Sequence, residues 1–190
     1  MRWHTLMRIA LVVATVVAVP AAYAHAQQFS ARLNGFEELG AQNNETGAIL
    51  SNGQGTLKLT LNQRTATITY TLTYSNVGTT PPGTGTVTQA HIHFGKEHVA
   101  GGIIVFLCTN VAGPTGTPAC PLNSGTVTGT LMAADVQAVT KQNVSSGDFN
   151  AIAAALISDT AYANVHTTAF PAGEIRGQVI GEDDQGNQDN

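Results

Sequence analysis

The sequence is organised around Gln89–Gly95, which reads QAHIHFG. The second, fourth and sixth residues of this stretch are apolar and alternate with polar ones, which is the period-2 pattern of a β-strand with one buried face. His91 and His93 therefore project from the same face of the strand, about 7 Å apart. Because the apolar residues occupy the other face, we expect both histidines to point away from the core.

A second stretch near the end of the chain, Ala161–Thr168, shows the same alternation, and its polar face includes Asn164 and His166. If the two strands pair, three imidazoles converge on one outer face of the sheet. Imidazole nitrogen suits copper and zinc, and three such ligands with an open position form a type-2 copper or catalytic zinc site. The sequence therefore predicts a metal site at His91, His93 and His166. The alternative is that these histidines are structural and hydrogen-bond to neighbouring strands.

Other polar residues could support these histidines. Metal-bound histidines need hydrogen-bond partners for the second ring nitrogen. The candidates are Glu38, Asn164, Glu174 and Gln178. Glu174 and Arg176 are two residues apart on a predicted strand, so we expect them to share a face and form an ion pair or hydrogen-bond network. The alternative role for Arg176 is to steer an anion to a nearby metal. His98, in the loop after His93, is a further candidate ligand.

The first 26 residues have the pattern of a secretory signal peptide. Arg2 and Arg8 form the positive segment, Ile9–Val19 forms the apolar segment, and Ala24–Ala26 is a cleavage site with two small residues. The apolar segment is too short to span a bilayer. We therefore expect a secreted, periplasmic or extracellular protein that begins at Gln27 and has no membrane span. Retention of the segment as an anchor is the alternative.

Removing 26 of the 190 residues leaves 164, a normal size for one domain, which we expect over residues 27–181. The acidic residues 182–190 have nothing to bury and are expected to be disordered. Without Arg2 and Arg8, six of the eight Lys and Arg residues remain against twelve Asp and Glu, a net charge of −6. Because no basic cluster occurs, nucleic acid and anionic membranes are excluded as partners. An extracellular protein or a small ligand is the expected partner.

Cys108 and Cys120 are the only cysteines. Because the signal peptide implies an oxidising compartment, we expect them to form a disulfide around the Thr109–Ala119 loop. A metal site with two thiolates is the alternative, but no neighbouring Cys or His has the spacing of a zinc finger. Asn44 and Asn143 fit the glycosylation pattern, which matters only if the source organism modifies asparagine.

Most of the chain consists of short runs of strand character separated by turns. Gln54–Asn62 and Thr65–Tyr74 alternate on either side of a tight turn at Asn62–Gln63, which predicts a hairpin. The threonine-rich faces of these strands are expected to be solvated, and an ice- or carbohydrate-binding surface is the alternative. Further strands are expected at residues 29–35, 103–108, 125–131 and 174–180.

Two alanine-rich segments interrupt the strands. Asp148–Ser158 has apolar residues at helical spacing, and Ser146 or Asp148 could cap its start, which predicts a helix. Ala133–Thr140 predicts a short helical turn. Eight or so short strands with one short helical insertion indicate an all-β Greek-key sandwich or barrel.

Three stretches resemble the CHRD domain, a family named after chordin. They are LNGFEE at Leu33–Glu38, AHIH at Ala90–His93, and YANVHT at Tyr162–Thr167, which is followed by FPAGEIRGQ at Phe170–Gln178. The resemblance covers nearly all of the mature chain. It implies a secreted or cell-surface β-domain that acts as a binding or structural module. In chordin the domain lies within an extracellular antagonist of growth factors.

The sequence departs from the CHRD pattern in two places. Leu39-Gly40 stands where the family usually has a proline. The loop after His93 usually begins with Gly-Pro or a similar pair in the family, but here it reads FGKEH at Phe94–His98. The additional histidine strengthens the metal hypothesis. We therefore predict a non-enzymatic CHRD module with a three-histidine site for copper or zinc.

A looser resemblance is to copper-zinc superoxide dismutase, which also has a His-x-His pair on a strand and a later Val-His. The matching residues here are His91, His93, His166 and Arg176. This resemblance implies a shared Greek-key architecture and an alternative function as a copper carrier or a copper enzyme with superoxide-type redox chemistry. The bridging histidine and the zinc carboxylate of that family have no counterpart unless His98 serves, so a complete dismutase is not implied.

Overall fold

The computed structural model describes residues 26–39 and 47–182. Asn44, residues 1–25 of the expected signal peptide and residues 183–190 of the expected acidic tail therefore lie outside the described residues. The strands are β1 (Gln27–Asn34), β2 (Gln54–Asn62), β3 (Thr67–Ser75), β4 (Val87–Phe94), β5 (Gly102–Thr109), β6 (Gly125–Leu131), β7 (Ala161–Thr167) and β8 (Ile175–Gly181). The helical elements are the 3-10 turns η1 (Gly35–Glu37), η2 (Ala133–Asp135) and η3 (Thr140–Gln142) and the helix α1 (Phe149–Ile157).

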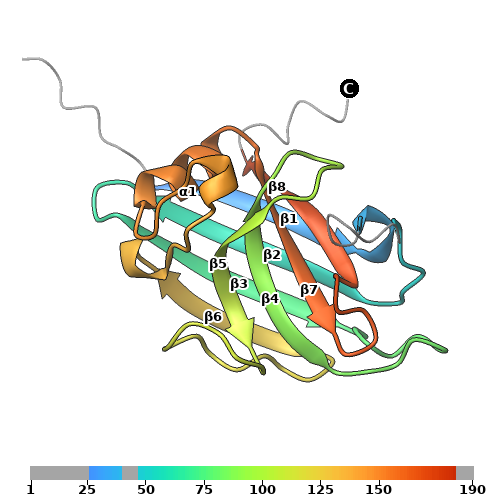
Figure 1. The fold of residues 1–190 in the computed structure, drawn as a ribbon. Coiled ribbons are helices and arrows are strands. Elements are labelled where there is room, and N and C mark those ends of the chain that lie inside the picture. The colour runs from blue at the N-terminus through green and yellow to red at the C-terminus, as the bar shows by residue number, and fades with distance from the viewer. Residues whose placement is uncertain (1–25, 40–46, 183–190) are drawn as a thin grey trace, which may run out of the picture.

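All eight strands belong to one antiparallel sheet in the order β5-β4-β7-β8-β1-β2-β3-β6. The sheet folds over on itself, so that β5, β4 and β7 lie in front of β1, β2 and β3 in Figure 1. The neighbours β4–β7, β8–β1 and β3–β6 are far apart in sequence, because connections cross between the two layers in Greek-key fashion. The expected all-β Greek-key sandwich or barrel with one short helical insertion is confirmed. No helix in the described parts of the chain is both long and apolar enough to cross a membrane.

The core lies between the two layers and is built by period-2 alternation. Leu57, Leu59 and Leu61 of β2 are fully buried and lie opposite Leu72, Tyr70 and Ile68 of β3. On the outer face of β2, β3 and β6, the same register aligns eight threonines with one lysine. They are Thr56, Lys58, Thr60, Thr69, Thr71, Thr73, Thr126, Thr128 and Thr130. Such alternation is expected of the outer, solvated face of an antiparallel sheet.

The turn between β2 and β3 is wider than the predicted two-residue turn. It occupies residues 63–66, and β3 begins at Thr67. The Asn62 side-chain oxygen accepts hydrogen bonds from the backbone N–H groups of Arg64 (3.1 Å) and Thr65 (3.2 Å). An asparagine side chain that captures backbone donors in this way stabilises a local turn, and Ala66 completes it with a left-handed φ of 50°.

The predicted helix is confirmed as α1, and Asp148 caps it by accepting a hydrogen bond from the N–H of Ala151 at 3.1 Å. The helix packs its apolar side against β7 and β8. The expected helical turn over Ala133–Thr140 is instead two separate 3-10 turns, η2 and η3. Between them the N–H of Gln137 donates to the backbone oxygen of Ile104 in β5, which interrupts local helical hydrogen bonding.

The two ends of the sheet, β5 and β6, come together along a seam that lacks a full ladder. Three links cross or cover it. Tyr70 of β3 donates a hydrogen bond through the core to the oxygen of Leu107, and Gln137 donates to β5 as described above. The third link is the expected disulfide, which is confirmed: the Sγ atoms of Cys108 and Cys120 are 2.06 Å apart and join β5 to the loop before β6.

Candidate metal centre

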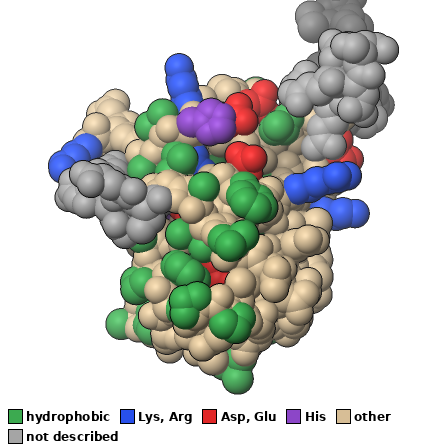
Figure 2. Space-filling model, turned by 90° about the vertical axis from the view of Figure 1, so that its right-hand side faces the viewer, with side chains coloured by type: hydrophobic (Ala, Val, Ile, Leu, Met, Phe, Trp, Pro, Cys, Tyr) green, Lys and Arg blue, Asp and Glu red, His purple; other side chains and the backbone are tan. Residues whose placement is uncertain are grey.

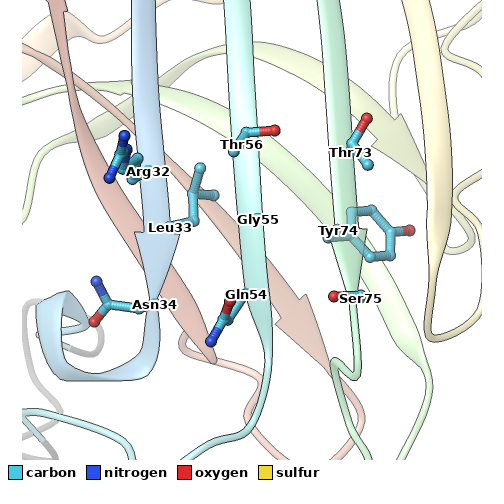
Figure 3. Close-up of a pocket in the computed structure, with 9 residues that line it drawn as sticks. All are labelled: Arg32, Leu33, Asn34, Gln54, Gly55, Thr56, Thr73, Tyr74 and Ser75. Atoms are coloured by element: carbon cyan, nitrogen blue, oxygen red, sulfur yellow. The ribbon is translucent and has the colours of Figure 1, made fainter.

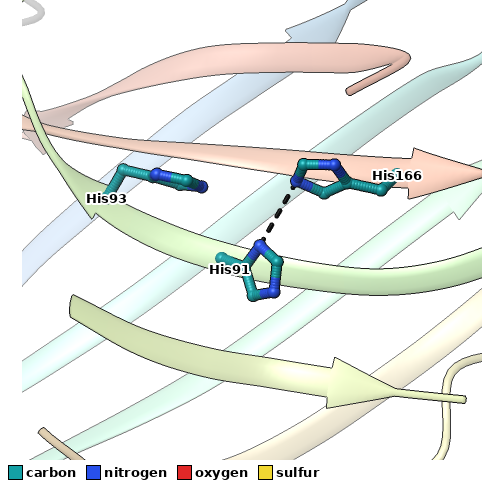
Figure 4. A group of neighbouring side chains, drawn as sticks. All are labelled: His91, His93 and His166. Carbon is teal, nitrogen blue, oxygen red and sulfur yellow. Dashed lines mark hydrogen bonds between the residues drawn. The ribbon is translucent and has the colours of Figure 1, made fainter. Parts of the chain in front are cut away.

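The pairing of β4 with β7 brings the three predicted histidines together. In the register of this pair, His91 lies opposite Asn164 and His93 lies opposite Tyr162, while His166 is paired with the residue two before His91. One nitrogen from each of the three histidines lies within 4.8 Å of the other two. Figure 4 shows the rings of His93 and His166 pointing toward one another, with His91 Nδ1 3.2 Å from His166 Nε2.

The three histidines are on the expected face but are not exposed as expected. Ala90 and Ile92 face the core, so His91 and His93 project on the opposite side, yet their exposed fractions are 0% and 7%, and that of His166 is 6%. Loops and rings cover them, as the contacts to Gly101, Pro171 and Phe106 described below show. The face drawn in Figure 2 shows histidine at one place, as expected when three of the four described histidines are buried.

Backbone oxygens fix the orientation of two of the rings. His93 Nδ1 lies 3.0 Å from the oxygen of Gly101, and His166 Nδ1 lies 2.9 Å from the oxygen of Pro171. A carbonyl oxygen can only accept a hydrogen bond, so both Nδ1 atoms carry the proton and both Nε2 atoms keep a free lone pair. A metal-ligating histidine needs this arrangement, in which the outer nitrogen donates to the protein and the inner nitrogen is available to the ion.

Burial keeps the imidazoles neutral. Burial, together with smaller contributions from the nearby rings of His166 and His93, lowers the pKa of His91 to about 2. Burial likewise lowers the pKa of His93 to about 4, against the hydrogen bond to Gly101, which raises it. Burial also lowers the pKa of His166. A metal competes with protons for imidazole nitrogen, so the cluster is ready to bind an ion at neutral and mildly acidic pH.

Comparison with known proteins identifies the family. The family model of the CHRD domain matches residues 29–179, from β1 to β8, and this span includes all three histidines. The chain belongs to the CHRD domain family. The predicted resemblance is therefore confirmed, and the family supports a structural or binding module. No curated protein matches the chain, and no solved structure matches it.

In this CHRD domain, Arg176 and Tyr162 extend the histidine cluster as a stack. The Tyr162 ring lies parallel to the His93 ring, with centroids 4.6 Å apart and an angle of 7°. The guanidinium of Arg176 lies 3.4 Å from the centroid of the same tyrosine ring. Its Nη2 donates to the backbone oxygens of Lys96 (3.2 Å) and Val99 (3.0 Å). Arg176 therefore holds the loop that follows β4 over the domain's outer face.

Asn164 is the predicted supporting residue that reaches the histidines directly. Its Oδ1 lies 3.0 Å from Nε2 of His93 and 3.0 Å from Nε2 of His166. Nε2 of His91 is buried and has no hydrogen-bond partner among the described residues. Glu38 is buried near Arg176, and its charge opposes the lowering of the arginine pKa that burial causes.

Glu174 and His98 lie away from the cluster. The Glu174 carboxylate accepts hydrogen bonds from Ser51 Oγ (2.7 Å), the N–H of Gly78 (2.8 Å) and Thr167 Oγ1 (2.9 Å). Among the described residues it forms no ion pair with Arg176, because β8 begins after Glu174 and the two side chains do not share a strand face. The side chain of His98 is 70% exposed, with its Nε2 3.6 Å from Glu97 Oε1.

Sequence reasoning missed four members of the centre. Tyr162, Asn164 and His166 are spaced two residues apart on β7, so side-chain alternation places them on the same face and could have identified Tyr162. The ring of Phe106, which meets His91 edge-on at 4.4 Å between centroids, lies on the neighbouring strand. Gly101 and Pro171 contribute only backbone oxygens, for which the sequence carries no signal.

A separate groove lies on the outer face of β1, β2 and β3 (Figure 3). Arg32 is its only charged side chain. The residues that line it are Arg32, Leu33, Asn34, Gln54, Gly55, Thr56, Thr73, Tyr74 and Ser75. None of these residues is an Asp, Glu, His or Cys, so the groove offers no set of the usual metal ligands.

Proposed function

We propose that this CHRD domain is a secreted binding module that holds one copper or zinc ion through His91, His93 and His166. The supporting observation is the orientation of two buried neutral imidazoles, which backbone oxygens lock with their Nε2 lone pairs facing inward. Three nitrogen ligands suit Cu(II) and Zn(II), and Cu(II) is bound more tightly than Zn(II) at most sites of this kind. Copper is therefore the first candidate.

Secretion belongs to the same proposal. The pattern of residues 1–26 is that of a signal peptide, and the disulfide between Cys108 and Cys120 fits an oxidising compartment. Cleavage after Ala26 gives a mature chain that begins at Gln27. Mass spectrometry of the exported protein should find this N-terminus, and an intact Met1 would contradict it.

The alternative function is a copper enzyme with superoxide-type chemistry, in which Arg176 would steer the anion. The geometry favours binding over this alternative. Arg176 is only 3% exposed, and its guanidinium already contacts Tyr162 and the backbone oxygens of Lys96 and Val99. An arginine held in this way has no free face to attract an anion from solution.

Metal analysis tests the proposal directly. The purified protein is dialysed against Cu(II) or Zn(II), then against buffer, beside a His91→Ala/His93→Ala double variant. His98→Ala is the matched control because it removes an exposed histidine outside the cluster. We expect one equivalent of metal in the wild type and in the control, and none in the double variant when its circular dichroism is unchanged. No retained metal in the wild type would overturn the proposal and leave the three histidines as structural residues.

A further inference from the structure

Asn164 occupies the space between two metal-binding nitrogens. It lies on β7 opposite His91, its side chain is 97% buried, and its Oδ1 is 3.0 Å from Nε2 of both His93 and His166. No other described side chain contacts both nitrogens. The amide therefore has a central position that a supporting residue at the rim of the cluster would not have.

The hydrogen-bonding groups around Asn164 Oδ1 do not match, because acceptor atoms face one another. The Nδ1 atoms of His93 and His166 donate their protons to backbone oxygens, so both Nε2 atoms are acceptors. His166 Nε2 also lies 3.2 Å from His91 Nδ1, which can donate to it, whereas His93 Nε2 has only the Asn164 amide as a partner. An amide oxygen is also an acceptor, and acceptors do not hydrogen-bond to one another. In a buried site, where water does not screen them, lone pairs that face each other are unfavourable. Two arrangements remove the conflict: an amide NH₂ group facing the two nitrogens, or a cation among the three acceptors.

We propose that Asn164 serves both states, with its amide nitrogen in the metal-free protein and its amide oxygen as a fourth ligand in the metal-bound protein. In the metal-free state one amide N–H bond donates to Nε2 of His93, and the other donates to Nε2 of His166, whose lone pair is shared with Nδ1 of His91 at 3.2 Å. A rotation of about 180° around the Cβ–Cγ bond exchanges the two ends of the amide without moving the strand. This inference rests on the proposed metal site and assigns its fourth ligand.

The chemistry of an amide fits this role better than that of its closest relatives. An aspartate would place a negative charge beside two acceptors in the metal-free state, and burial of an unpaired charge is costly. A leucine would leave the lone pair of His93 Nε2 without a donor. Because oxygen is a harder ligand than nitrogen or sulfur, an amide oxygen favours Cu(II) and Zn(II) over Cu(I). Asn164 thus supplies hydrogen-bond donors to the imidazole nitrogens in the metal-free site, and its oxygen contributes to the selectivity for the ion in the metal-bound site.

The first arm of the test examines the metal-free wild type by NMR. We expect His93 and His166 in the Nδ1–H tautomer, and we expect the Asn164 NH₂ protons to exchange slowly and couple across hydrogen bonds to both Nε2 atoms. Titration with Zn(II) should shift the NH₂ signals and remove these couplings. An Asn164 amide that never contacts the imidazole nitrogens would overturn the inference, whether or not the protein binds metal.

The second arm compares Asn164→Leu and Asn164→Asp with Gln89→Glu. Gln89 is paired with His166 and is half-buried, so Gln89→Glu adds the same negative charge near the cluster but leaves the Asn164 amide in place. We expect Asn164→Leu to lower the affinity for Cu(II) about 10- to 100-fold and to change the Cu(II) EPR spectrum, as the loss of a metal-site partner does. Asn164→Asp should bind Cu(II) at least as tightly as the wild type, and Gln89→Glu should leave the spectrum unchanged.

The outcomes separate the two proposals. If all variants bind copper with the wild-type affinity and spectrum, Asn164 is not a ligand and the three-histidine site stands alone. If the wild type binds no metal, the metal site fails, and with it the ligand role. If Asn164→Leu does not fold, the spectrum of Asn164→Asp and the wild-type NMR titration still decide the ligand role.

Discussion

The hydroxyl of Tyr70 donates a 2.7 Å hydrogen bond to the backbone oxygen of Leu107, on the opposite layer of the sheet. The two residues are 37 positions apart in sequence. Burial, with a smaller contribution from Asp135, raises the pKa of Tyr70 to about 12, so the hydroxyl keeps the proton that it donates. This bond satisfies an oxygen of β5, a strand that has only one neighbour in the sheet.

Tyr70→Phe should lower the free energy of unfolding by about 1–3 kcal/mol, because it leaves a buried acceptor without a donor. Urea denaturation followed by fluorescence or circular dichroism measures this loss. Thr71→Val on the same strand is the control, since it removes an exposed hydroxyl and should change stability by about 0.5 kcal/mol or less. Equal effects from the two variants would show that the hydrogen bond contributes nothing specific.

Gly173→Ala should be more destabilising than Gly116→Ala. Both glycines have left-handed φ values, 132° and 89°, so alanine is strained at either position by about 1 kcal/mol. At Gly173 a Cβ atom would also lie 2.3 Å from Oε2 of the buried Glu38, whereas at Gly116 nothing lies within 4 Å. Thermal unfolding of the two variants should therefore differ, and equal melting temperatures would mean that the Glu38 side chain moves aside freely.

The metal-free protein should lose stability as the pH falls below about 6.5. In the unfolded chain each histidine binds a proton near pH 6.5, but in the folded protein His93 does so near pH 4 and His91 near pH 2. The unfolded state therefore holds more protons over this range, and each buried histidine lowers the unfolding free energy by about 1.4 kcal/mol per pH unit. Urea denaturation between pH 7 and 5 checks the slope. His91→Gln should reduce it by about a third, and an unchanged slope would contradict the assignment.

Arg176→Met should loosen the loop between β4 and β5. The substitution keeps an unbranched side chain but removes the donors to the backbone oxygens of Lys96 and Val99, and the cation over Tyr162. Hydrogen exchange should become about tenfold faster at the amide groups of this loop. Arg32→Met is the control because Arg32 is an exposed arginine on β1. Protection that stays the same in Arg176→Met would show that other contacts hold the loop.

Much of the fold follows from local patterns. The alternation in β2 and β3, a cap at the start of α1 and the pairing of Cys108 with Cys120 can be predicted from neighbouring residues or from the absence of other cysteines, and the structure confirms each. Of the two candidate caps, Ser146 and Asp148, the structure shows Asp148 in this role. The side of the strand taken by His91 and His93 follows from the same alternation. Local patterns of this kind determine which way a side chain points.

The surroundings of the histidines could not be predicted in the same way. Their burial depends on loops that return over the sheet, and two of their partners are backbone oxygens, which every residue has. Glu174 illustrates the limit well. Its spacing from Arg176 suggested an ion pair or a hydrogen-bond network with that residue. Its carboxylate instead accepts hydrogen bonds from Thr167 and from Ser51 and Gly78, and the last two lie about a hundred residues earlier in the chain. Contacts over such distances are fixed by topology and not by spacing.

The disulfide between Cys108 and Cys120 has a consequence for the behaviour of the protein in concentrated solution. It joins β5 to the segment leading into β6, and these strands form the two ends of the sheet. Edge strands that are held against each other cannot pair with another molecule, whereas an edge strand that is released can pair with a strand of a second chain. We therefore expect reduction of the Cys108–Cys120 disulfide to make the two edge strands more accessible to a second chain, and so to promote self-association.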